Sequence, residues 1–148
     1  MKTFLFMFCV LMAIYAYALS TKRPTAYYDS VEACFENITS NKNINSLKNL
    51  NISQPIPKNE YDDLVNASIC AFKKDGVITP EGTLSKSSIY QYCAQVFLNS
   101  EKILKCQTIV KHCTDLECSG SECTPEEVKP YIECAINNNI LSLLDFSL

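Results

Sequence analysis

Apolar residues follow a helical repeat through most of the chain. The first apolar stripe has the spacing i, i+3, i+4, i+7 and predicts a helix over residues 27–39. Its members are Val31, Cys34, Phe35 and Ile38. Residues 40–59 are rich in Asn, Ser and Lys and contain two prolines, so we expect mostly loop there, with at most a short helical piece at residues 44–50.

Three further helices are predicted by the same spacing, each preceded by a residue that can cap it. Asn59 is expected to cap the first of them, which ends before Gly76, a residue suited to the left-handed position after a helix. Ser85 or Ser87 is expected to cap the second, and Ser100 the third. Their apolar positions are Tyr61, Leu64, Val65, Ala67, Ile69, Cys70 and Phe72; Ile89, Tyr92, Cys93, Val96 and Phe97; and Ile103, Cys106, Ile109, Val110 and Cys113.

The sequence Thr-Pro-Glu-Glu marks the start of the last helix. Thr124 is a suitable N-cap, Pro125 takes the first position, where no N–H is needed, and Glu127 completes a capping box. Val128, Tyr131, Ile132, Ala135 and Ile136 then form its apolar face. No alternating stretch is long enough to build a sheet. The predicted fold class is therefore all-α, a compact bundle of five or six short helices.

The N-terminus indicates the compartment. Lys2 precedes an apolar run over residues 4–14, and small residues precede a cleavage point after Ala18 or Ser20, as in a secretory signal peptide. The run is shorter than the roughly 20 residues of a membrane-spanning helix. We therefore predict a signal peptide at residues 1–20 and one secreted, extracellular domain at 21–148, without stable membrane insertion. Loss of Lys2 changes the net charge from −3 to −4, which argues against a nucleic-acid partner.

Eight cysteines remain after the signal peptide is removed, and an even number in a small exported chain is typical of a disulfide framework. Cys106 and Cys113 are seven residues apart on one helix face, so they must pair with different partners. Cys118 and Cys123 can close a small loop on themselves, which leaves the other pairs open. The alternative, a zinc site with His112, lacks the paired C-x2-C spacing, so no metal is expected.

Catalysis has few candidates in this sequence. His112 is the single histidine, and no G-x-S-x-G motif accompanies it. A calcium-dependent phospholipase would need a glycine-rich loop, and the chain has three glycines in all. His112 is therefore expected to be a solvent-facing helix residue. We predict a protein that is not an enzyme and that needs no cofactor.

The cysteine spacings carry a family resemblance. The segment SICAFKKDGVITPEG is similar to the third-helix region of insect odorant-binding proteins. The intervals of 23, 13, 7 and 21 residues that connect Cys70, Cys93, Cys106, Cys113 and Cys134 resemble the ant venom allergen 2/4 family, an odorant-binding-protein-like group. The resemblance covers roughly residues 31–141.

This resemblance implies a bundle around an apolar cavity that binds a small hydrophobic molecule of pheromone, lipid or alkaloid type, in a venom component and candidate allergen. It also implies disulfides between Cys34 and Cys70, Cys93 and Cys106, and Cys113 and Cys134, in addition to the small loop expected between Cys118 and Cys123. Some members carry a further cysteine that joins two chains. This sequence has none at that place, so a monomer or a non-covalent dimer is expected.

Candidate residues for the ligand pocket come from the inward helical positions, each of which has a competing interpretation as plain core. They are Phe35, Ile38, Leu64, Phe72, Ile89, Val96, Phe97, Ile109, Val110, Tyr131 and Ile136. The apolar C-terminal segment ILSLLDFSL is expected either to cover the pocket mouth or to pack as the end of the last helix. Of three glycosylation sequons, those at Asn37 and Asn51 are expected to be modified, and Asn66 to be buried.

The sequence leaves two candidate functions, which belong to different classes of protein. The first is a carrier of small hydrophobic ligands with an internal cavity. The alternative is a venom effector or protein-interaction module that acts through its surface and has a filled core.

Overall fold

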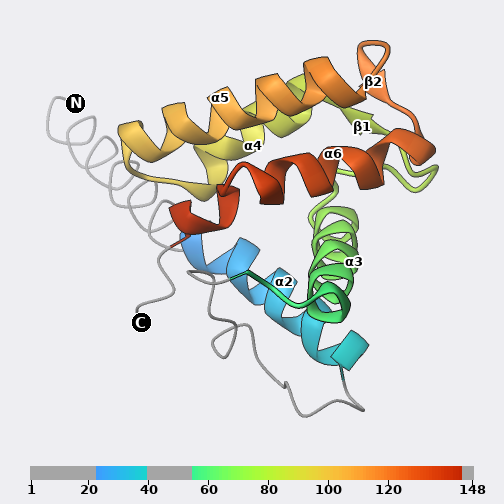
Figure 1. Cartoon of the computed structure of the whole chain (residues 1–148). Coiled ribbons are helices and arrows are strands. Elements are labelled where there is room, and N and C mark those ends of the chain that lie inside the picture. The colour runs from blue at the N-terminus through green and yellow to red at the C-terminus, as the bar shows by residue number, and fades with distance from the viewer. Residues whose placement is uncertain (1–22, 40–54, 145–148) are drawn as a thin grey trace, which may run out of the picture.

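Five α-helices form most of the part of the chain that the computed structural model describes, residues 23–39 and 55–144 (Figure 1). The predicted signal peptide, residues 1–20, and the predicted helical piece at residues 44–50 lie outside these ranges. In chain order the elements are α2 (Arg23–Thr39), α3 (Lys58–Lys74), β1 (Leu84–Ser85), α4 (Lys86–Val96), α5 (Ser100–Glu117), β2 (Glu122–Cys123), α6 (Pro125–Asn137) and the 3-10 helix η2 (Ile140–Leu143). The predicted all-α, disulfide-stapled class is confirmed.

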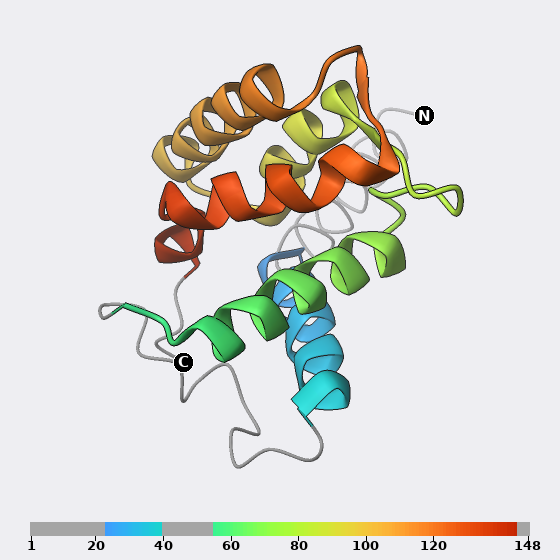
Figure 2. The ribbon, with the colours of Figure 1, turned by 45° about the vertical axis from the view of Figure 1, so that its right-hand side comes forward.

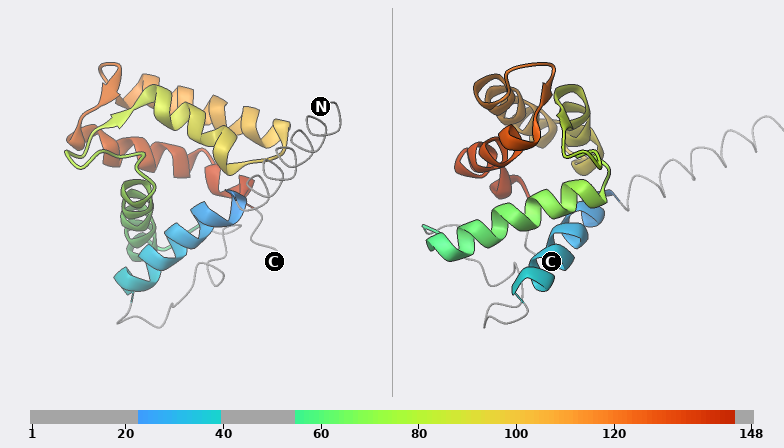
Figure 3. Two further views of the ribbon diagram at one scale, coloured as in Figure 1. Left: turned by 180° about the vertical axis from the view of Figure 1, so that it is seen from behind. Right: turned by 90° about the vertical axis from the view of Figure 1, so that its right-hand side faces the viewer.

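The helices form two groups. In Figure 3 (right), α4, α5 and α6 are seen nearly end-on above α3, and α2 lies beneath α3. Figure 2 shows α3 crossing below α6, with α2 packed against α3 at a steep angle. The α2–α3 pair is the most extensive contact between elements, and α6 connects the groups because it packs on both α5 and α3. The core lies between α3 and the three upper helices and extends to α2, where Val31, Cys34 and Phe35 are buried.

The structure contains the three disulfides that the resemblance implied and the small Cys118–Cys123 loop expected from the spacing of those two cysteines. Each of three bonds joins two helices: Cys34–Cys70 joins α2 to α3, Cys93–Cys106 joins α4 to α5, and Cys113–Cys134 joins α5 to α6. Cys118–Cys123 closes the short connection between α5 and α6. Both pairs of adjacent upper helices are thus fixed covalently.

The N-cap position of helix α3 lies two residues before the predicted cap Asn59. The helix starts after Pro57, whose carbonyl accepts the N–H of Tyr61 at 2.9 Å, so Asn59 lies inside the first turn and the predicted Asn59 cap is wrong. The other end is as predicted. Gly76 has φ +72°, and Val77 N–H bonds the carbonyl of Phe72 at 2.8 Å, which is the Schellman arrangement.

The caps of the later helices agree with the sequence at two places out of three. Ser85 caps α4, and Thr124 with Glu127 forms the predicted capping box of α6. The predicted cap Ser100 is wrong, because Asn99 caps α5. The Asn99 side-chain oxygen accepts two backbone N–H groups, at 2.8 and 3.3 Å, which leaves Ser100 as the first helical residue.

A minimal antiparallel pair of strands fastens the α5–α6 connection to the start of α4. Leu84 lies opposite Cys123, and Ser85 opposite Glu122. Lys86 adds a hydrogen bond from its ammonium group to the carbonyl of Cys118 at 3.0 Å. These two-residue strands were not predicted, since period-two alternation cannot be recognised over so short a stretch.

Candidate functional site: an apolar cavity

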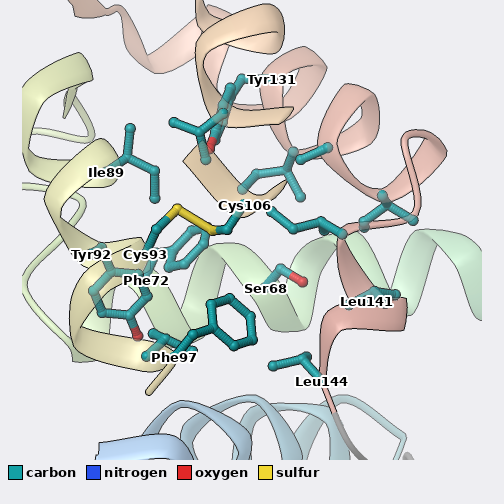
Figure 4. A pocket seen from close by; sticks show the side chains of 16 residues that line it. Ser68, Phe72, Ile89, Tyr92, Cys93, Phe97, Cys106, Tyr131, Leu141 and Leu144 are labelled. Carbon is teal, nitrogen blue, oxygen red and sulfur yellow. A yellow bond between two sulfur atoms is a disulfide. The ribbon is translucent and has the colours of Figure 1, made fainter. Parts of the chain in front are cut away.

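An apolar cavity lies where α3, the three upper helices and η2 meet. Figure 4 shows its side chains pointing into a common space, with the Cys93–Cys106 disulfide in the wall. The lining residues are Ser68, Phe72, Ile89, Tyr92, Cys93, Val96, Phe97, Cys106, Val110, Tyr131, Ile132, Ala135, Ile136, Ile140, Leu141 and Leu144. The free volume between them is about 40 Å³. This volume is far below the roughly 300–1,000 Å³ that ligand sites commonly have.

Aromatic packing forms one side of the wall. Phe72 on α3 and Tyr92 on α4 meet edge to face, with ring centroids 5.6 Å apart and planes at 84°. This geometry places the positive ring edge against the negative face of the partner ring. Tyr92 also donates its hydroxyl hydrogen to the carboxylate of Asp75, which accepts a second hydrogen bond from Ser30 of α2 at 2.9 Å. The polar end of Tyr92 is therefore held outside the apolar part of the wall.

Ser68 is the one non-aromatic hydroxyl in the wall. Its side chain is 3% exposed and donates a hydrogen bond to the carbonyl oxygen of Leu64 at 2.9 Å. That bond uses the single hydroxyl hydrogen, so the oxygen can act towards the cavity only as an acceptor. Of the described residues that line this cavity, none carries a carboxylate, ammonium, guanidinium or imidazole group.

The C-terminal segment closes the cavity from one side. Asn139 adopts the left-handed conformation, φ 61°, and ends α6, so that η2 turns back over the bundle. Leu141 and Leu144 of this segment point into the cavity in Figure 4. Of the two predicted alternatives, the described part of the segment forms a separate turn against the cavity rather than an extension of the last helix.

Seven of the eleven predicted pocket residues line this cavity. They are Phe72, Ile89, Val96, Phe97, Val110, Tyr131 and Ile136. The other four do not. Phe35 and Leu64 are completely buried elsewhere in the core, Ile109 is partly buried beside it, and Ile38 is 38% exposed. Phe35 and Ile38 belong to α2, which packs on α3 and α4 from outside the cavity, and Leu64 lies one turn too early on α3.

Other lining residues were not predicted for the pocket, for three reasons. Ser68 is polar, although its position four residues before Phe72 on α3 could have indicated it. Tyr92, Ile132 and Ala135 were assigned to apolar helix faces but not to the pocket. Leu141 and Leu144 reach the cavity only because Asn139 redirects the chain, and helical periodicity carries no signal for that turn.

His112 lies on the exposed side of α5, as predicted. It borders a shallow surface groove with Tyr90, Leu104, Gln107, Thr108, Lys111 and Asp115. Lys111 and Asp115 form an exposed ion pair with an N–O distance of 2.7 Å, and each shifts the pKa of the other: the Lys111 pKa is raised and the Asp115 pKa lowered. Among the described residues, no group of three or more His, Cys, Asp or Glu could hold a metal ion.

The exposure of one of the three sequon asparagines differs from the prediction. Asn37 is exposed on α2, and Asn51 lies outside the described residues. Asn66 was expected to be buried because it precedes Cys70 by one turn, but it is exposed. The buried face of α3 instead passes through its neighbours Val65, Ala67 and Ser68. Within the described residues, no helix is sufficiently long and apolar to cross a membrane.

Comparison with known proteins gives similarity to venom allergens of ants. The chain is 27% identical to venom allergen 4 of Solenopsis geminata over 146 residues, which cover 97% of this chain and 95% of that protein. Venom allergen 4 of Solenopsis invicta matches with the same identity and coverage. No solved structure matches the chain. The family model described as ant venom allergen Sol i 2 family matches residues 53–138, more than half of the chain, and this chain belongs to that family.

Proposed function

We propose that this protein is a secreted venom component that carries a small hydrophobic molecule in the cavity between α3, α4, α5, α6 and η2. The observation that carries the proposal is the nearly uniform apolar wall, to which five elements contribute and in which Ser68 is the one non-aromatic hydroxyl. Ligand pockets of this kind are mostly apolar with a few polar groups that orient the ligand. The names of the two relatives support a venom protein and an allergen.

The cavity must expand to accept a ligand, because about 40 Å³ is too small for a molecule of ten or more carbon atoms. One element of the wall, η2, follows the last disulfide of the chain. The last disulfide cysteine is Cys134, so η2 is held by packing of Leu141 and Leu144 and by short-range hydrogen bonds such as Ser142 to the Asn139 carbonyl at 2.7 Å. Displacement of η2 would enlarge the cavity without breaking a covalent bond.

Ser68 would orient the ligand in this proposal. Its oxygen is a hydrogen-bond acceptor in an apolar wall, and its own hydrogen is already donated to Leu64. A ligand with one hydroxyl or N–H group would satisfy this acceptor. The matching chemistry is an apolar skeleton with a single donor.

The second candidate is a surface-acting venom protein with a filled core, and the small cavity volume favours it. Under this alternative the apolar wall is ordinary core packing. Exposed apolar side chains would supply the contact surface, and those described on the α4–α5 side are Tyr90, Leu98, Leu104 and Leu116.

Equilibrium titration separates the two candidates. The oxidised, delipidated protein would be titrated with the uncharged fluorophore N-phenyl-1-naphthylamine, and bound fluorophore displaced with 1-decanol. Saturable binding to one site with full displacement would support the carrier. Absence of binding up to the solubility limit of the fluorophore would reject the carrier and leave the surface-acting protein.

A further inference from the structure

Among the residues that the structure describes, the cavity wall contains polar atoms but no ionised group. Its polar side chains are Ser68, Tyr92 and Tyr131, all hydroxyl groups that are neutral near pH 7. Tyr92 is committed to Asp75, and Ser68 to Leu64. The cavity therefore offers an oxygen acceptor to a ligand, but no counter-charge.

Charged side chains are present on all four helices around the cavity, and none of them is in its wall. Those at a spacing of three or four residues from a lining residue on the same helix, or just beyond the helix end, are Asp75, Lys86, Lys102, Glu127, Lys129 and Glu133. Several of them have other partners. Asp75 binds Ser30 and Tyr92, Lys86 binds the Cys118 carbonyl, and Glu127 binds the start of α6.

An ion that enters such a wall loses its hydration without compensation. The cost of transferring an isolated carboxylate or ammonium group to an apolar environment is so large that the group changes its protonation state instead. A neutral hydroxyl acceptor offsets only a small part of this cost, since a net hydrogen bond contributes far less than the hydration of an ion. Charge, rather than length or shape, should then be the strictest criterion for entry.

We propose that the cavity binds only the uncharged form of its ligand. The inference rests on the proposed carrier function and narrows its ligand class to alcohols, esters, hydrocarbons and the neutral forms of amines and acids. Fatty carboxylates and alkylammonium ions are excluded. For an ionisable ligand, the apparent affinity must follow the fraction of its neutral form.

The test uses three ligands with the same ten-carbon chain, 1-decanol, decanoic acid and decylamine, in competition with N-phenyl-1-naphthylamine between pH 5 and pH 9. Decanol affinity should stay constant, and it controls for pH effects on the protein itself. Decanoic acid should bind about tenfold more weakly for each pH unit above its own pKa, and decylamine about tenfold more tightly for each unit as the pH rises towards its own pKa.

Lys102→Gln is the matched control variant, because Lys102 lies one turn before the lining residue Cys106 on α5. The pH slopes of all three ligands should be the same in this variant as in the wild-type protein. The inference would be overturned if decanoate bound as tightly at pH 8 as at pH 5. It would also be overturned if decanoate bound to the wild-type protein at pH 8 but not to Lys102→Gln, because Lys102 would then supply a counter-charge. If decanol itself fails to bind at any pH, the carrier function is rejected, and this inference with it.

Discussion

The hydroxyl of Ser68 lies 2.9 Å from the carbonyl oxygen of Leu64, one turn earlier on α3, and donates its hydrogen to it inside the cavity wall. Leu64 keeps its helical N–H partner without this bond, so the bond contributes little to folding. The position therefore holds a polar atom whose remaining hydrogen-bonding capacity faces an apolar space. Under the proposed carrier function, a ligand with one hydrogen-bond donor would use this capacity.

Ser68→Ala should leave the fold intact and change the ligand preference. The free energy of unfolding should change by less than about 1 kcal/mol, since the lost hydrogen bond is offset by the higher helix propensity of alanine. Decanol affinity should fall about 2- to 10-fold, the value of one net hydrogen bond, while decane affinity stays the same. Urea denaturation and fluorophore competition measure the two effects.

The control for this substitution is Asn66→Gln, because Ser68 also completes the sequon of Asn66. Asn66 is exposed, so its substitution removes the sequon without touching the cavity. A decrease of decanol affinity in Asn66→Gln equal to that in Ser68→Ala would assign the effect to glycosylation and contradict the role of Ser68.

Ala135→Leu should close the cavity. Ala135 is 4% exposed and lines the cavity from α6, and the three added carbon atoms occupy the space that a ligand needs. Binding of N-phenyl-1-naphthylamine should weaken at least about tenfold, and overpacking should cost at most about 1–3 kcal/mol of stability. The matched control is Ala94→Leu, an exposed alanine on α4 that should not alter binding. Equal affinity in both variants would show that the fluorophore binds elsewhere.

The disulfides should differ in their contribution to stability. Cys34–Cys70 spans 36 residues and Cys118–Cys123 spans 5. Because a longer closed loop restricts the unfolded chain more, removal of the first bond should cost about 4 kcal/mol and removal of the second about 2 kcal/mol. Urea denaturation of the two double-alanine variants would measure this difference. A larger loss for the short loop would mean that its role in fastening β2 and α6 outweighs chain entropy.

Glu127 should make the stability of the protein depend on pH. Its carboxylate accepts the backbone N–H groups of Thr124 at 2.9 Å and Ser119 at 3.1 Å, and these bonds lower the pKa of Glu127 below its ordinary value of 4.5. A lowered folded-state pKa gives stability that is complete above the ordinary pKa and is lost as the pH falls through the folded-state value.

Comparison with Glu127→Gln would reveal this dependence, since glutamine keeps a capping-box acceptor but carries no charge. The wild-type protein should have the higher melting temperature at pH 7, and the two curves should converge below the lowered pKa. A difference that is constant from pH 7 to pH 3 would show that the charge of Glu127 has no part in the effect.

The helices and their ends could be read from the sequence because their causes are local. Apolar residues at helical spacing, Gly76 after α3 and the Thr124–Glu127 box each act within a few residues of the chain. The two wrong caps are also local errors: α3 begins after Pro57, two residues before the predicted Asn59, and α5 is capped by Asn99, one residue before the predicted Ser100. The cysteine spacing was sufficient to indicate the family, because such spacing is a distance along the chain and can be counted in the sequence.

The cavity depended on tertiary structure. An apolar stripe determines that a residue such as Leu64, Phe72 or Ile109 turns away from water, but several helices compete to cover it. Which of these residues meet around an unfilled space depends on how α3 crosses the upper helices and on the turn at Asn139 that carries Leu144 back to them. The sequence by itself determined the helices, the disulfide framework and the family. Only the packing of distant segments decided the cavity. The apolar pattern of one helix predicts which of its residues are buried, but a cavity depends on the relative positions of residues from several helices.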